Sequence, residues 1–434
     1  MQLKASRIAA IVDGQLVGED VVVDGVQFDS RADIEGRLFI AIEAERNGHD
    51  FVSHAFSMGA TCALVSQSLT DQHESIVVVA DTLQAFTSLA REVRRSELAN
   101  ADVVGVTGSV GKTSTKNLIA GALSSLNVSS SLKSFNNEQG VPFTILNASG
   151  DCEVVVVEMG MRGFGEISHL SEIAEPTIGV VTCVGEAHTA RLGGIEGVAK
   201  AKAELVEALP AYGTAVLNAD DERVAAMAGH CSGSVVTYGV GADVSVSRFQ
   251  PDKFGRYRFG FSSPWGSGEI GLQVPGEHMM QNALAAIAVG GVKSVPIEDI
   301  VVGIETVIAE DHRMVLHPFE SGSVLIDDCY NANPTSVAAA LQTVANLGLG
   351  QKIAVLGEMA EVDDPERAHK YVARLAEELG IDVVAIDTDL YGVAAHHDVP
   401  DFVRKGLMNG NAAVVVKGSR VAGLERIVEA LKLS

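Results

Sequence analysis

A loop able to hold phosphate is the strongest chemical signal in this chain. Residues 103–106 form a short β-branched run typical of a buried strand, and residues 116–123 have the apolar spacing of a helix. Glycines between the two let backbone N–H groups approach phosphate oxygens, while the helix N-terminus and Lys112 supply positive charge and Thr113 can bind Mg²⁺. We therefore predict a nucleotide-binding loop made of Gly108, Ser109, Val110, Gly111, Lys112, Thr113 and Ser114.

The loop departs in one place from the usual G-x-x-x-x-G-K-[ST] pattern. Val106 stands where the first glycine is expected, and Gly105 precedes it. A glycine loop by itself is a weak signal, since many tight turns contain glycine. The Lys-Thr pair after a strand favours a nucleotide, and a purely structural turn is the alternative.

Polar residues follow three further predicted strands. Glu158 ends one run, His188 follows the next, and the Asp220-Asp221 pair follows a third. Because ligands bind at the carboxyl ends of strands in an open parallel sheet, we expect these side chains to meet the phosphate loop at one edge. Glu158 and Thr113 offer the hard oxygen ligands that suit Mg²⁺, whereas histidine is a less usual Mg²⁺ ligand. The simpler alternatives are a strand end in water for Glu158, an ordinary loop or core histidine, and helix capping by the aspartates.

The last third of the chain has dense polar loops of its own. Residues 327–334 read DDCYNANP directly after a predicted strand, and Lys417 and Ser419 follow another strand. Arg313 stands shortly before the first of these loops. The first loop could instead cap a helix, Arg313 could be a solvated charge, and Lys417 could lie at a helix start. The Asn136-Asn137 pair is similarly ambiguous, because it could form a turn.

Charge and composition exclude several classes of protein. A net charge of −24 argues against a nucleic-acid surface, which would need clustered lysine and arginine. The first residues lack the apolar stretch of a signal peptide, and no run approaches the ~20 apolar residues of a membrane span. The five cysteines are scattered without a C-x-x-C pair, which suits a reducing cytoplasm. We therefore expect a cytoplasmic protein that binds neither nucleic acid nor membrane.

The strand and helix patterns divide the chain into three parts, at residues 1–98, 99–310 and 311–434. Continuous Val/Ile runs in the middle part predict a parallel sheet buried on both faces, with antiparallel strands appended to it at 250–274. The last part repeats the α/β rhythm of a small doubly wound domain. The expected fold class is therefore α/β: a small N-terminal domain, a central P-loop-type mononucleotide-binding parallel sheet, and a Rossmann-like C-terminal domain.

Taken together, these motifs resemble the Mur ligase family, the ATP-dependent amide-forming enzymes of cell-wall precursor synthesis. The resemblance runs through nearly the whole chain, and the 327–334 loop is most similar to members that add D-alanyl-D-alanine to UDP-N-acetylmuramoyl-tripeptide. The segments that carry it are 107–113, Asn136-Asn137 with 140–142, 158–160 with 165–167, Ala187-His188, Ala201-Lys202, 217–221, 276–278 with Asn282, Arg313, 327–334, 357–359 and 417–419, together with 29–31 and Gly48-His49.

The resemblance implies a three-domain ligase whose first domain holds the UDP-sugar, the second ATP and the third the incoming amine. ATP would convert the substrate carboxylate to an acyl phosphate, which the amine of D-alanyl-D-alanine then attacks. By the family pattern Lys112 contacts the β and γ phosphates. One Mg²⁺ would bind at Thr113 and Glu158, and a second with help from His188. Lys202, which the sequence alone suggests is a surface lysine, corresponds to one that relatives carry as a carbamate, an anionic metal ligand. The implied catalytic set is Lys112, Glu158, His188 and Lys202.

The remaining site residues follow from the same resemblance. His278 and Asn282 would lie near the nucleotide base and Asp328 near its ribose. Arg313 would neutralise phosphate once the last domain closes. The resemblance also implies small-molecule partners and a monomer. The two organic substrates, UDP-MurNAc-tripeptide and D-Ala-D-Ala, would contact Ser30, Arg31, Asn136, Asn137, Tyr330, Asn331, Asn333, Lys417 and Ser419.

Several positions depart from the family pattern. Met279 stands where relatives usually have asparagine, Ala44 and Asn47 replace glycine and aspartate, and residues 361–363 read EVD in place of ELG. These departures concern the base, uridine and dipeptide contacts, and none touches the implied catalytic set. The alternatives are another amide ligase of Mur, folylpolyglutamate or cyanophycin type, a nucleotide-hydrolysing regulatory module, and a kinase.

Overall fold

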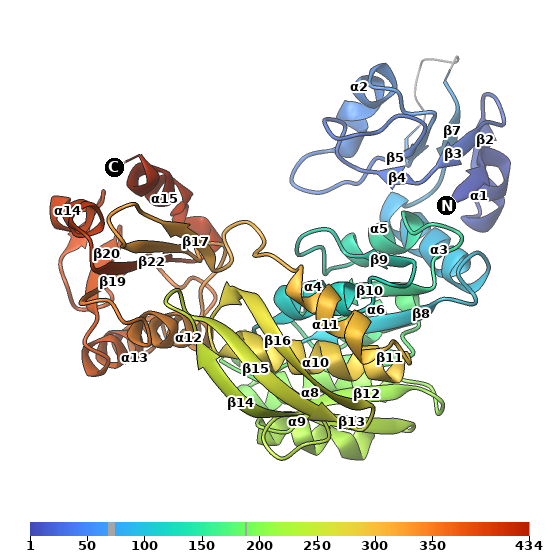
Figure 1. Ribbon diagram of the computed structural model, residues 1–434. Helices are drawn as coiled ribbons and strands as arrows, with labels where there is room; N and C mark the ends of the chain where they lie inside the picture. The colour runs from blue at the N-terminus through green and yellow to red at the C-terminus, as the bar shows by residue number, and fades with distance from the viewer. Residues whose placement is uncertain (68–73, 187–188, 434) are drawn as a thin grey trace.

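The structure, a computed structural model, describes residues 1–67, 74–186 and 189–433, and Figure 1 shows them as three α/β units. The central unit lies between the other two, and the N-terminal and C-terminal units stand apart from each other on either side of it. The α/β fold expected from the sequence is confirmed. The domain boundaries at residues 98 and 310 stay a prediction, although α3 ends at Arg95 before β8 and α11 ends at Glu305 before β17.

A six-stranded parallel sheet forms the middle of the central unit, in the order β13-β12-β11-β8-β10-β9. Strands β8, β10 and β11 carry the continuous valine runs. They are almost entirely buried, as a parallel sheet between two helix layers requires. The strands are β8 (Asp102–Thr107), β9 (Val128–Ser130), β10 (Val154–Glu158), β11 (Ile178–Val181), β12 (Thr214–Asn218) and β13 (Ser234–Tyr238).

Helices cover both faces of this sheet. Helices α4 and α10 share a core with Val104 and Val106, whereas α5, α6 and α8 share a second core with Val103. Alternate residues of β8 therefore enter separate cores, which fixes the strand between the two layers. The elements are α4 (Lys112–Ala122), α5 (Gly140–Leu146), α6 (Glu166–Ala174), α7 (Thr189–Leu192), α8 (Ile195–Glu207), α9 (Glu222–Ala226), the 3₁₀ turn η2 (Met227–His230), α10 (His278–Val292) and α11 (Ile297–Glu305).

The antiparallel strands expected around residues 250–274 are present, but the prediction that they are appended to the central sheet is wrong. They form a separate three-stranded sheet, β14-β15-β16, which packs on α10 and α11. Tyr257, Phe259 and Phe261 alternate along β15 and enter the core, so this sheet buries one face against the helices. Its strands are β14 (Ser245–Pro251), β15 (Arg256–Ser263) and β16 (Gly266–Pro275).

The N-terminal unit has a five-stranded sheet in the order β2-β7-β6-β5-β4 and a ribbon of β1 and β3. Gly25, which has a φ of +80°, separates β3 from β4. The elements are β1 (Gln2–Lys4), α1 (Ala5–Ile11), β2 (Gln15–Val17), β3 (Val22–Asp24), β4 (Val26–Gln27), β5 (Leu38–Ile40), η1 (Gly48–Phe51), α2 (Val52–Ser57), β6 (Cys62–Val65), β7 (Ile76–Val78) and α3 (Thr82–Arg95).

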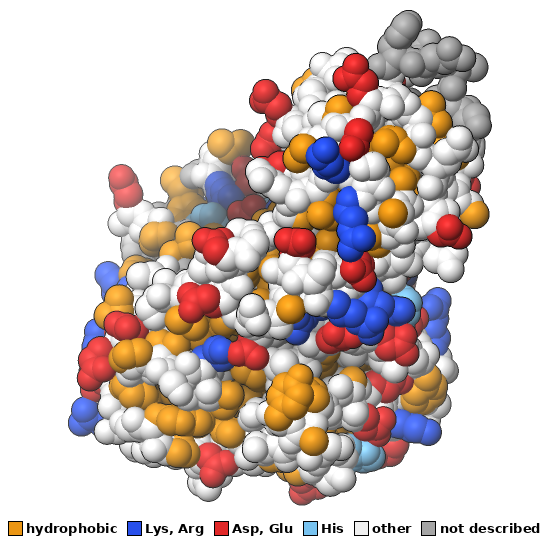
Figure 2. Space-filling model, turned by 90° about the vertical axis from the view of Figure 1, so that its right-hand side faces the viewer, with side chains coloured by type: hydrophobic (Ala, Val, Ile, Leu, Met, Phe, Trp, Pro, Cys, Tyr) orange, Lys and Arg blue, Asp and Glu red, His pale blue; other side chains and the backbone are white. Residues whose placement is uncertain are grey.

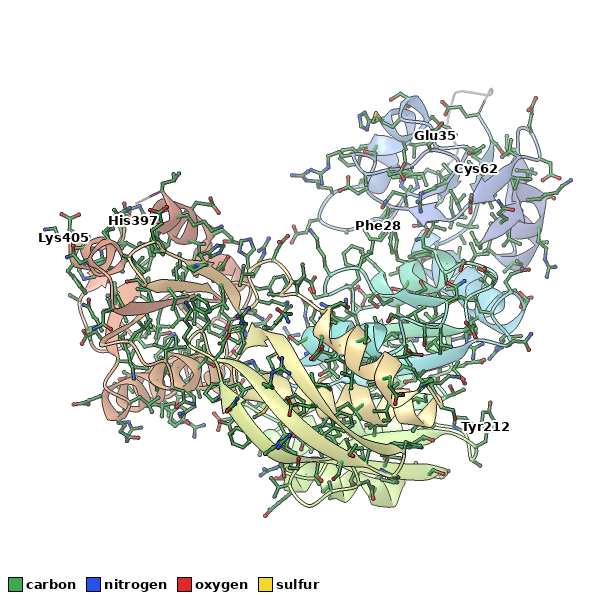
Figure 3. The ribbon with its side chains drawn as sticks, in the orientation of Figure 1. Phe28, Glu35, Cys62, Tyr212, His397 and Lys405 are labelled. Carbon is green, nitrogen blue, oxygen red and sulfur yellow. The ribbon has the colours of Figure 1, made fainter. Side chains whose placement is uncertain are left out.

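An apolar interface joins the N-terminal unit to the central one. Helix α3 packs on α5 and α6, and its Phe86 shares a core with Val155 of β10. Phe28 contacts Phe135 and Phe143 of the central unit, with ring centroids 5.8 and 5.2 Å away. Figure 3 shows Phe28 on the side of the N-terminal unit that faces the central one. These apolar contacts hold the N-terminal unit against the central one.

The C-terminal unit is doubly wound, as expected. Its sheet order is β17-β18-β22-β19-β20-β21, with β17 antiparallel to β18. Helices α12 and α13 cover one face, and α14 and α15 cover the other. The edge strand β17 was not predicted, because His317 and Pro318 interrupt its apolar pattern. The elements are β17 (Val315–Pro318), β18 (Val324–Asp327), α12 (Pro334–Ala345), β19 (Gln351–Leu356), α13 (Pro365–Glu378), β20 (Asp382–Ile386), β21 (Ala395–His396), α14 (Asp401–Asn409), β22 (Ala412–Lys417), η3 (Arg420–Ala422) and α15 (Glu425–Lys432).

The surface carries charges of both signs. On the face in Figure 2, Lys and Arg are interspersed with Asp and Glu, and hydrophobic side chains lie between them. No helix in the described part of the chain combines the length and apolar character needed to cross a bilayer. The cysteines at positions 62, 152, 183, 231 and 329 are all free.

Candidate active site

A polar cavity of about 1130 Å³ opens where the carboxyl ends of the central strands face the C-terminal unit. Both units contribute to its wall, so the cavity joins the phosphate loop to the polar loops of the last third of the chain. Seventeen of the predicted site residues line it: Ser109, Val110, Gly111, Lys112, Thr113, Ser114, Asn136, Asn137, Glu158, His278, Asn282, Arg313, Asp328, Tyr330, Asn331, Asn333 and Lys417.

The loop from β8 to α4 has the geometry of an anion cradle. Gly108 has a φ of +155°, and a Cβ there would lie 1.8 Å from Thr182 Oγ1. Gly111 is the N-cap of α4 with a φ of +82°, and a Cβ there would lie 2.8 Å from Asn282 Oδ1. In the described part of the chain, the backbone N–H groups of residues 110–113 have no hydrogen-bond acceptor. These free donors at a helix N-terminus fit a phosphate group.

Lys112 adds a positive charge to this cradle. Its Nζ donates to the carbonyl oxygen of Gly108 at 2.8 Å, which folds the side chain back over the loop. Desolvation lowers the pKa of Lys112, and the Glu158 carboxylate opposes that shift. A bound phosphate would favour the charged form of this amine by giving it an anionic partner.

Glu158 at the end of β10 is buried, with 1% of its surface exposed, so the alternative of a strand end in water is excluded. Its Oε2 accepts from Thr113 Oγ1 and its Oε1 from Asn136 Nδ2, both at 2.8 Å. The two hydrogen bonds fix the carboxylate beside the phosphate loop. A carboxylate and a hydroxyl are hard oxygen donors, and this donor set fits Mg²⁺.

Lys202 is buried on α8 and does not line the cavity, which differs from the surface position that the local sequence suggests. Burial, and then the positive charge of Lys112, lower the pKa of Lys202 to about 7. Lys202 therefore lies close enough to Lys112 of the phosphate loop for the two charges to interact. The predicted metal ligand His188 lies outside the described residues.

The polar loop after β18 is anchored by an ion pair. Lys417 Nζ lies 2.6 Å from Asp328 Oδ2 and also donates to the carbonyl oxygen of Asn331 at 2.9 Å. The other carboxylate oxygen of Asp328 accepts from the backbone N–H of Met314 at 3.2 Å. Asp328 thus ties the segment before β17 to the end of β22.

Arg313 is held over an aromatic ring in the cavity wall. Its guanidinium lies 3.9 Å from the centroid of the Tyr330 ring, a cation–π contact. The Tyr330 hydroxyl in turn hydrogen-bonds Ser134 of the central unit. The residues on either side of Arg313, His312 and Met314, have φ values of +61° and +57°, an uncommon backbone conformation for residues other than glycine. Such local strain is typical of functional segments.

Several polar residues have the structural roles that the sequence left open. Asn333 caps α12 in a capping box with Ser336, Asn137 accepts from the Gly140 N–H at the start of α5, and Asp221 caps α9. Asn333 and Asn137 also line the cavity, so capping and binding are compatible at these positions.

Four predicted residues besides Lys202 and His188 lie outside the cavity wall. Ser30 contacts His54 Nδ1 at 3.0 Å and Arg31 pairs with Asp29 at 2.8 Å, both in the N-terminal unit. Ser419 is buried, and its hydroxyl has no partner among the described residues. Gly108, the first residue of the loop, accepts a hydrogen bond from Lys112 Nζ through its carbonyl oxygen.

The sequence analysis missed four basic side chains in the cavity wall, at Arg162, His169, Arg191 and Arg420. Arg162 follows the strand that ends in Glu158, so its position after a strand end was a usable signal. It also missed Lys116, one turn after Lys112, whose buried Nζ donates to the carbonyl of Ser131 at 2.5 Å. Met279, the departure from the family pattern, enters the core and does not line the cavity.

The fold and the site are those of a P-loop-type nucleotide-binding protein with a cavity between two α/β units. Residues 106–290 match the family model of the Mur ligase middle domain, and residues 312–431 match that of the Mur ligase glutamate ligase domain. The chain belongs to the Mur ligase family.

Curated relatives and solved structures agree with this assignment. A UDP-N-acetylmuramoyl-tripeptide–D-alanyl-D-alanine ligase of Mycobacterium tuberculosis (strain H37Rv) is 34% identical over 99% of this chain and 98% of its own length. The ligase of the same name from Escherichia coli K12 is 32% identical over 98% of each chain. A crystal structure of MurF from Acinetobacter baumannii has a TM-score of 0.90 at 28% identity, covering 100% of this chain and 99% of that one. MurF of Thermotoga maritima, solved with ADP, shares the fold with a TM-score of 0.81 at 24% identity, over 95% of this chain and 97% of its own.

Proposed function

We propose that this chain is an ATP-dependent ligase that joins D-alanyl-D-alanine to UDP-N-acetylmuramoyl-tripeptide in peptidoglycan precursor synthesis. The observation that carries the proposal is the near full-length similarity to curated ligases of that activity, in a chain whose phosphate loop faces a second domain across one cavity. The physical need is clear: a carboxylate is a poor electrophile, so it must be activated before an amine can attack it.

In this proposal the loop of residues 108–114 holds the ATP phosphates. The free backbone N–H groups and Lys112 bind the phosphate oxygens, and Arg313 reaches them from the C-terminal unit. His278 and Asn282 contact the base, and Asp328 contacts the ribose. Burial lowers the pKa of His278, so the imidazole is neutral at pH 7 and able to accept or donate a hydrogen bond at the base.

Thr113, Glu158 and His188 would hold Mg²⁺ in this proposal, in two sites together with Lys202. A bound divalent cation would neutralise the charge that crowds between the γ-phosphate and the substrate carboxylate. The protein's own part is to fix the ligands: Asn136 and Thr113 orient the Glu158 carboxylate before any cation arrives.

We propose that Lys202 acts as a carbamate, the anionic form that carbon dioxide makes with a neutral lysine amine. Ordinary lysine has a pKa near ~10.4 and is almost wholly protonated at pH 7. The lowered pKa of Lys202, about 7, supports the proposal because it leaves a substantial neutral fraction. A carbamate in a buried site would also need the positive charge that a metal ion supplies.

The organic substrates would bind on either side of the phosphate loop. Ser30 and Arg31 belong to the UDP-sugar side, with Asn136 and Asn137 between the units. The dipeptide side would comprise Tyr330, Asn331, Asn333, Lys417 and Ser419. We propose that the chain works as a monomer in the cytoplasm on small-molecule substrates, and its free cysteines support a reducing compartment.

An acceptor screen with the purified enzyme tests the assignment. With ATP, Mg²⁺ and UDP-MurNAc-tripeptide, we expect phosphate release and a UDP-MurNAc-pentapeptide product only when D-alanyl-D-alanine is added. Single amino acids such as D-alanine and L-glutamate serve as matched controls. Turnover with one of these and none with the dipeptide would assign another ligase activity. Phosphate release without either organic substrate would favour a regulatory nucleotide hydrolase, and a stable phosphorylated product would favour a kinase.

A further inference from the structure

A second cluster of metal-binding side chains lies in the C-terminal unit. His312, Asp327 and Cys329 bring a ring nitrogen, a carboxylate oxygen and a sulfur within 4.8 Å of one another. Asp327 ends β18, Cys329 follows two residues later, and His312 lies in the segment before β17. We propose that these three side chains form a binding site for a zinc ion, separate from the magnesium ligands at the phosphate loop.

The geometry of the cluster suits zinc. His312 Nδ1 lies 2.8 Å from Asp327 Oδ2 and 3.6 Å from Cys329 Sγ. Tetrahedral zinc binds nitrogen at ~2.0–2.1 Å and sulfur at ~2.3 Å, which puts neighbouring ligand atoms about 3.4–3.6 Å apart. The sulfur–nitrogen separation already has this value. The nitrogen–oxygen separation is shorter because the two groups hydrogen-bond, and it would open by about half an ångström to meet the same tetrahedral spacing.

A nucleophilic Cys–His–Asp triad is the main alternative, and the geometry argues against it. In such a triad the nucleophile and the carboxylate contact opposite nitrogens of the imidazole ring. Here both the sulfur and the carboxylate approach the same atom, His312 Nδ1. A nitrogen, an oxygen and a sulfur within 4.8 Å of one another can instead bind one cation.

Asp327 is a buried carboxylate beside the other two ligands. Only 2% of this residue is exposed, and a buried carboxylate is costly unless a cation or hydrogen bonds compensate it. Its Oδ2 hydrogen-bonds His312 Nδ1 at 2.8 Å and its Oδ1 accepts from the backbone N–H of Cys329 at 3.3 Å, while Lys417 pairs with the adjacent Asp328. A divalent ion would replace the His312 hydrogen bond as the partner of this carboxylate. The mixed sulfur, nitrogen and oxygen set selects zinc over Mg²⁺, which takes oxygen ligands.

Binding would change the protonation of two ligands. The Cys329 thiol releases its proton to solvent and binds as a thiolate. The His312 ring loses the Nδ1 proton that it donates to Asp327 and carries its proton on Nε2, so that the Nδ1 lone pair is free to bind the ion. Asp327 binds as a carboxylate, and a water completes four-coordination. The ion would pin the segment before β17 to the end of β18. These segments carry Arg313 and Asp328. If the proposed function holds, zinc would therefore restrict the motion of two residues that contact ATP.

Metal retention by the intact protein tests this site. The protein is stripped with a chelator, loaded with ZnCl₂ in the presence of Mg²⁺, passed through a desalting column and analysed for zinc by mass spectrometry. We expect the wild-type protein to retain one equivalent, and Cys329→Ser and His312→Asn to lose it. Cys62→Ser and His397→Asn are matched controls in the N-terminal and C-terminal units, labelled in Figure 3, and should retain it.

Cobalt substitution gives a second readout that requires no enzymatic activity. With Co²⁺ in the site, we expect a thiolate-to-metal charge-transfer band in the wild type and in Cys62→Ser, and none in Cys329→Ser. An unchanged denaturant unfolding curve for Cys329→Ser would show that the loss is not misfolding. A wild-type protein that retains no zinc, or a Cys329→Ser variant that retains as much as the wild type, would overturn the proposal. Because neither readout measures ligation, failure of the ligase assignment would leave this result intact.

Discussion

Replacing Lys202 by alanine is expected to abolish ligation while the protein stays folded. If the carbamate of Lys202 binds a metal ion, its removal forfeits several kcal/mol of charge stabilisation, which corresponds to a fall in kcat of ~10³-fold or more. The fold should survive because the lost amine is a buried group whose charge is opposed by desolvation and by Lys112. Steady-state kinetics and a denaturant unfolding curve measure the two quantities separately.

Lys200 provides the matched control on the same helix. It is exposed and lies 5.8 Å over the ring of Phe164, two residues before Lys202. Lys200→Ala should change kcat by no more than about twofold, since exposed charges contribute little. Wild-type activity in Lys202→Ala would refute the carbamate role.

Further substitutions separate an anionic role of Lys202 from a cationic one. Lys202→Glu restores a carboxylate, so it should retain more activity than Lys202→Met or Lys202→Arg. A more active arginine variant would mean that the positive charge itself is needed. Carbon-13 bicarbonate gives a direct readout, because the wild-type protein should show a carbamate carbon signal by NMR that Lys202→Met lacks.

Replacing Lys112 by methionine is expected to reduce kcat by ~10²–10³-fold, the usual cost of losing one charge-stabilising donor in an active site. Lys112 Nζ donates a hydrogen bond to the Gly108 carbonyl oxygen, so the amine lies over the phosphate loop. Lys112 is the cationic side chain among residues 108–114. Methionine keeps most of the side-chain volume, so the effect should come from charge and not from packing. ATP-dependent phosphate release under saturating organic substrates is the measurement.

Lys253 is a suitable control for this substitution. It is exposed between β14 and β15, lies over Phe254 at 4.8 Å, and does not line the cavity. Lys253→Met should leave both kcat and the KM for ATP close to wild type. If Lys112→Met behaves in the same way, phosphate binding at this loop is contradicted.

The parts of the site that are local in the chain could be predicted from the sequence. The order of strand, glycine loop and helix at β8 and α4 follows from neighbouring residues, as does Glu158 at the end of a valine run. The positive φ of Gly108 and Gly111 is likewise typical of such a loop.

The non-local parts could not be predicted. Lys202 stands in a helical pattern with ordinary polar neighbours, and only the packing of α8 against β8 and β11 makes it buried. Strands β14–β16 pack over α10 and α11 and do not extend the central sheet, and this placement also depends on tertiary contacts that the local sequence does not specify. His312 is 15 residues from Asp327, a spacing with no metal-ligand motif, so the backbone path through β17 alone brings them together.

Calorimetric titration of the wild-type protein with ATP, in the presence and absence of Mg²⁺, shows whether the phosphate loop binds a metal–nucleotide complex. We expect one ATP site that is markedly stronger with Mg²⁺, and a loss of this Mg²⁺ dependence in Glu158→Gln, whose amide keeps the side-chain shape but not the charge. The absence of any ATP binding at saturating Mg²⁺ would contradict this expectation.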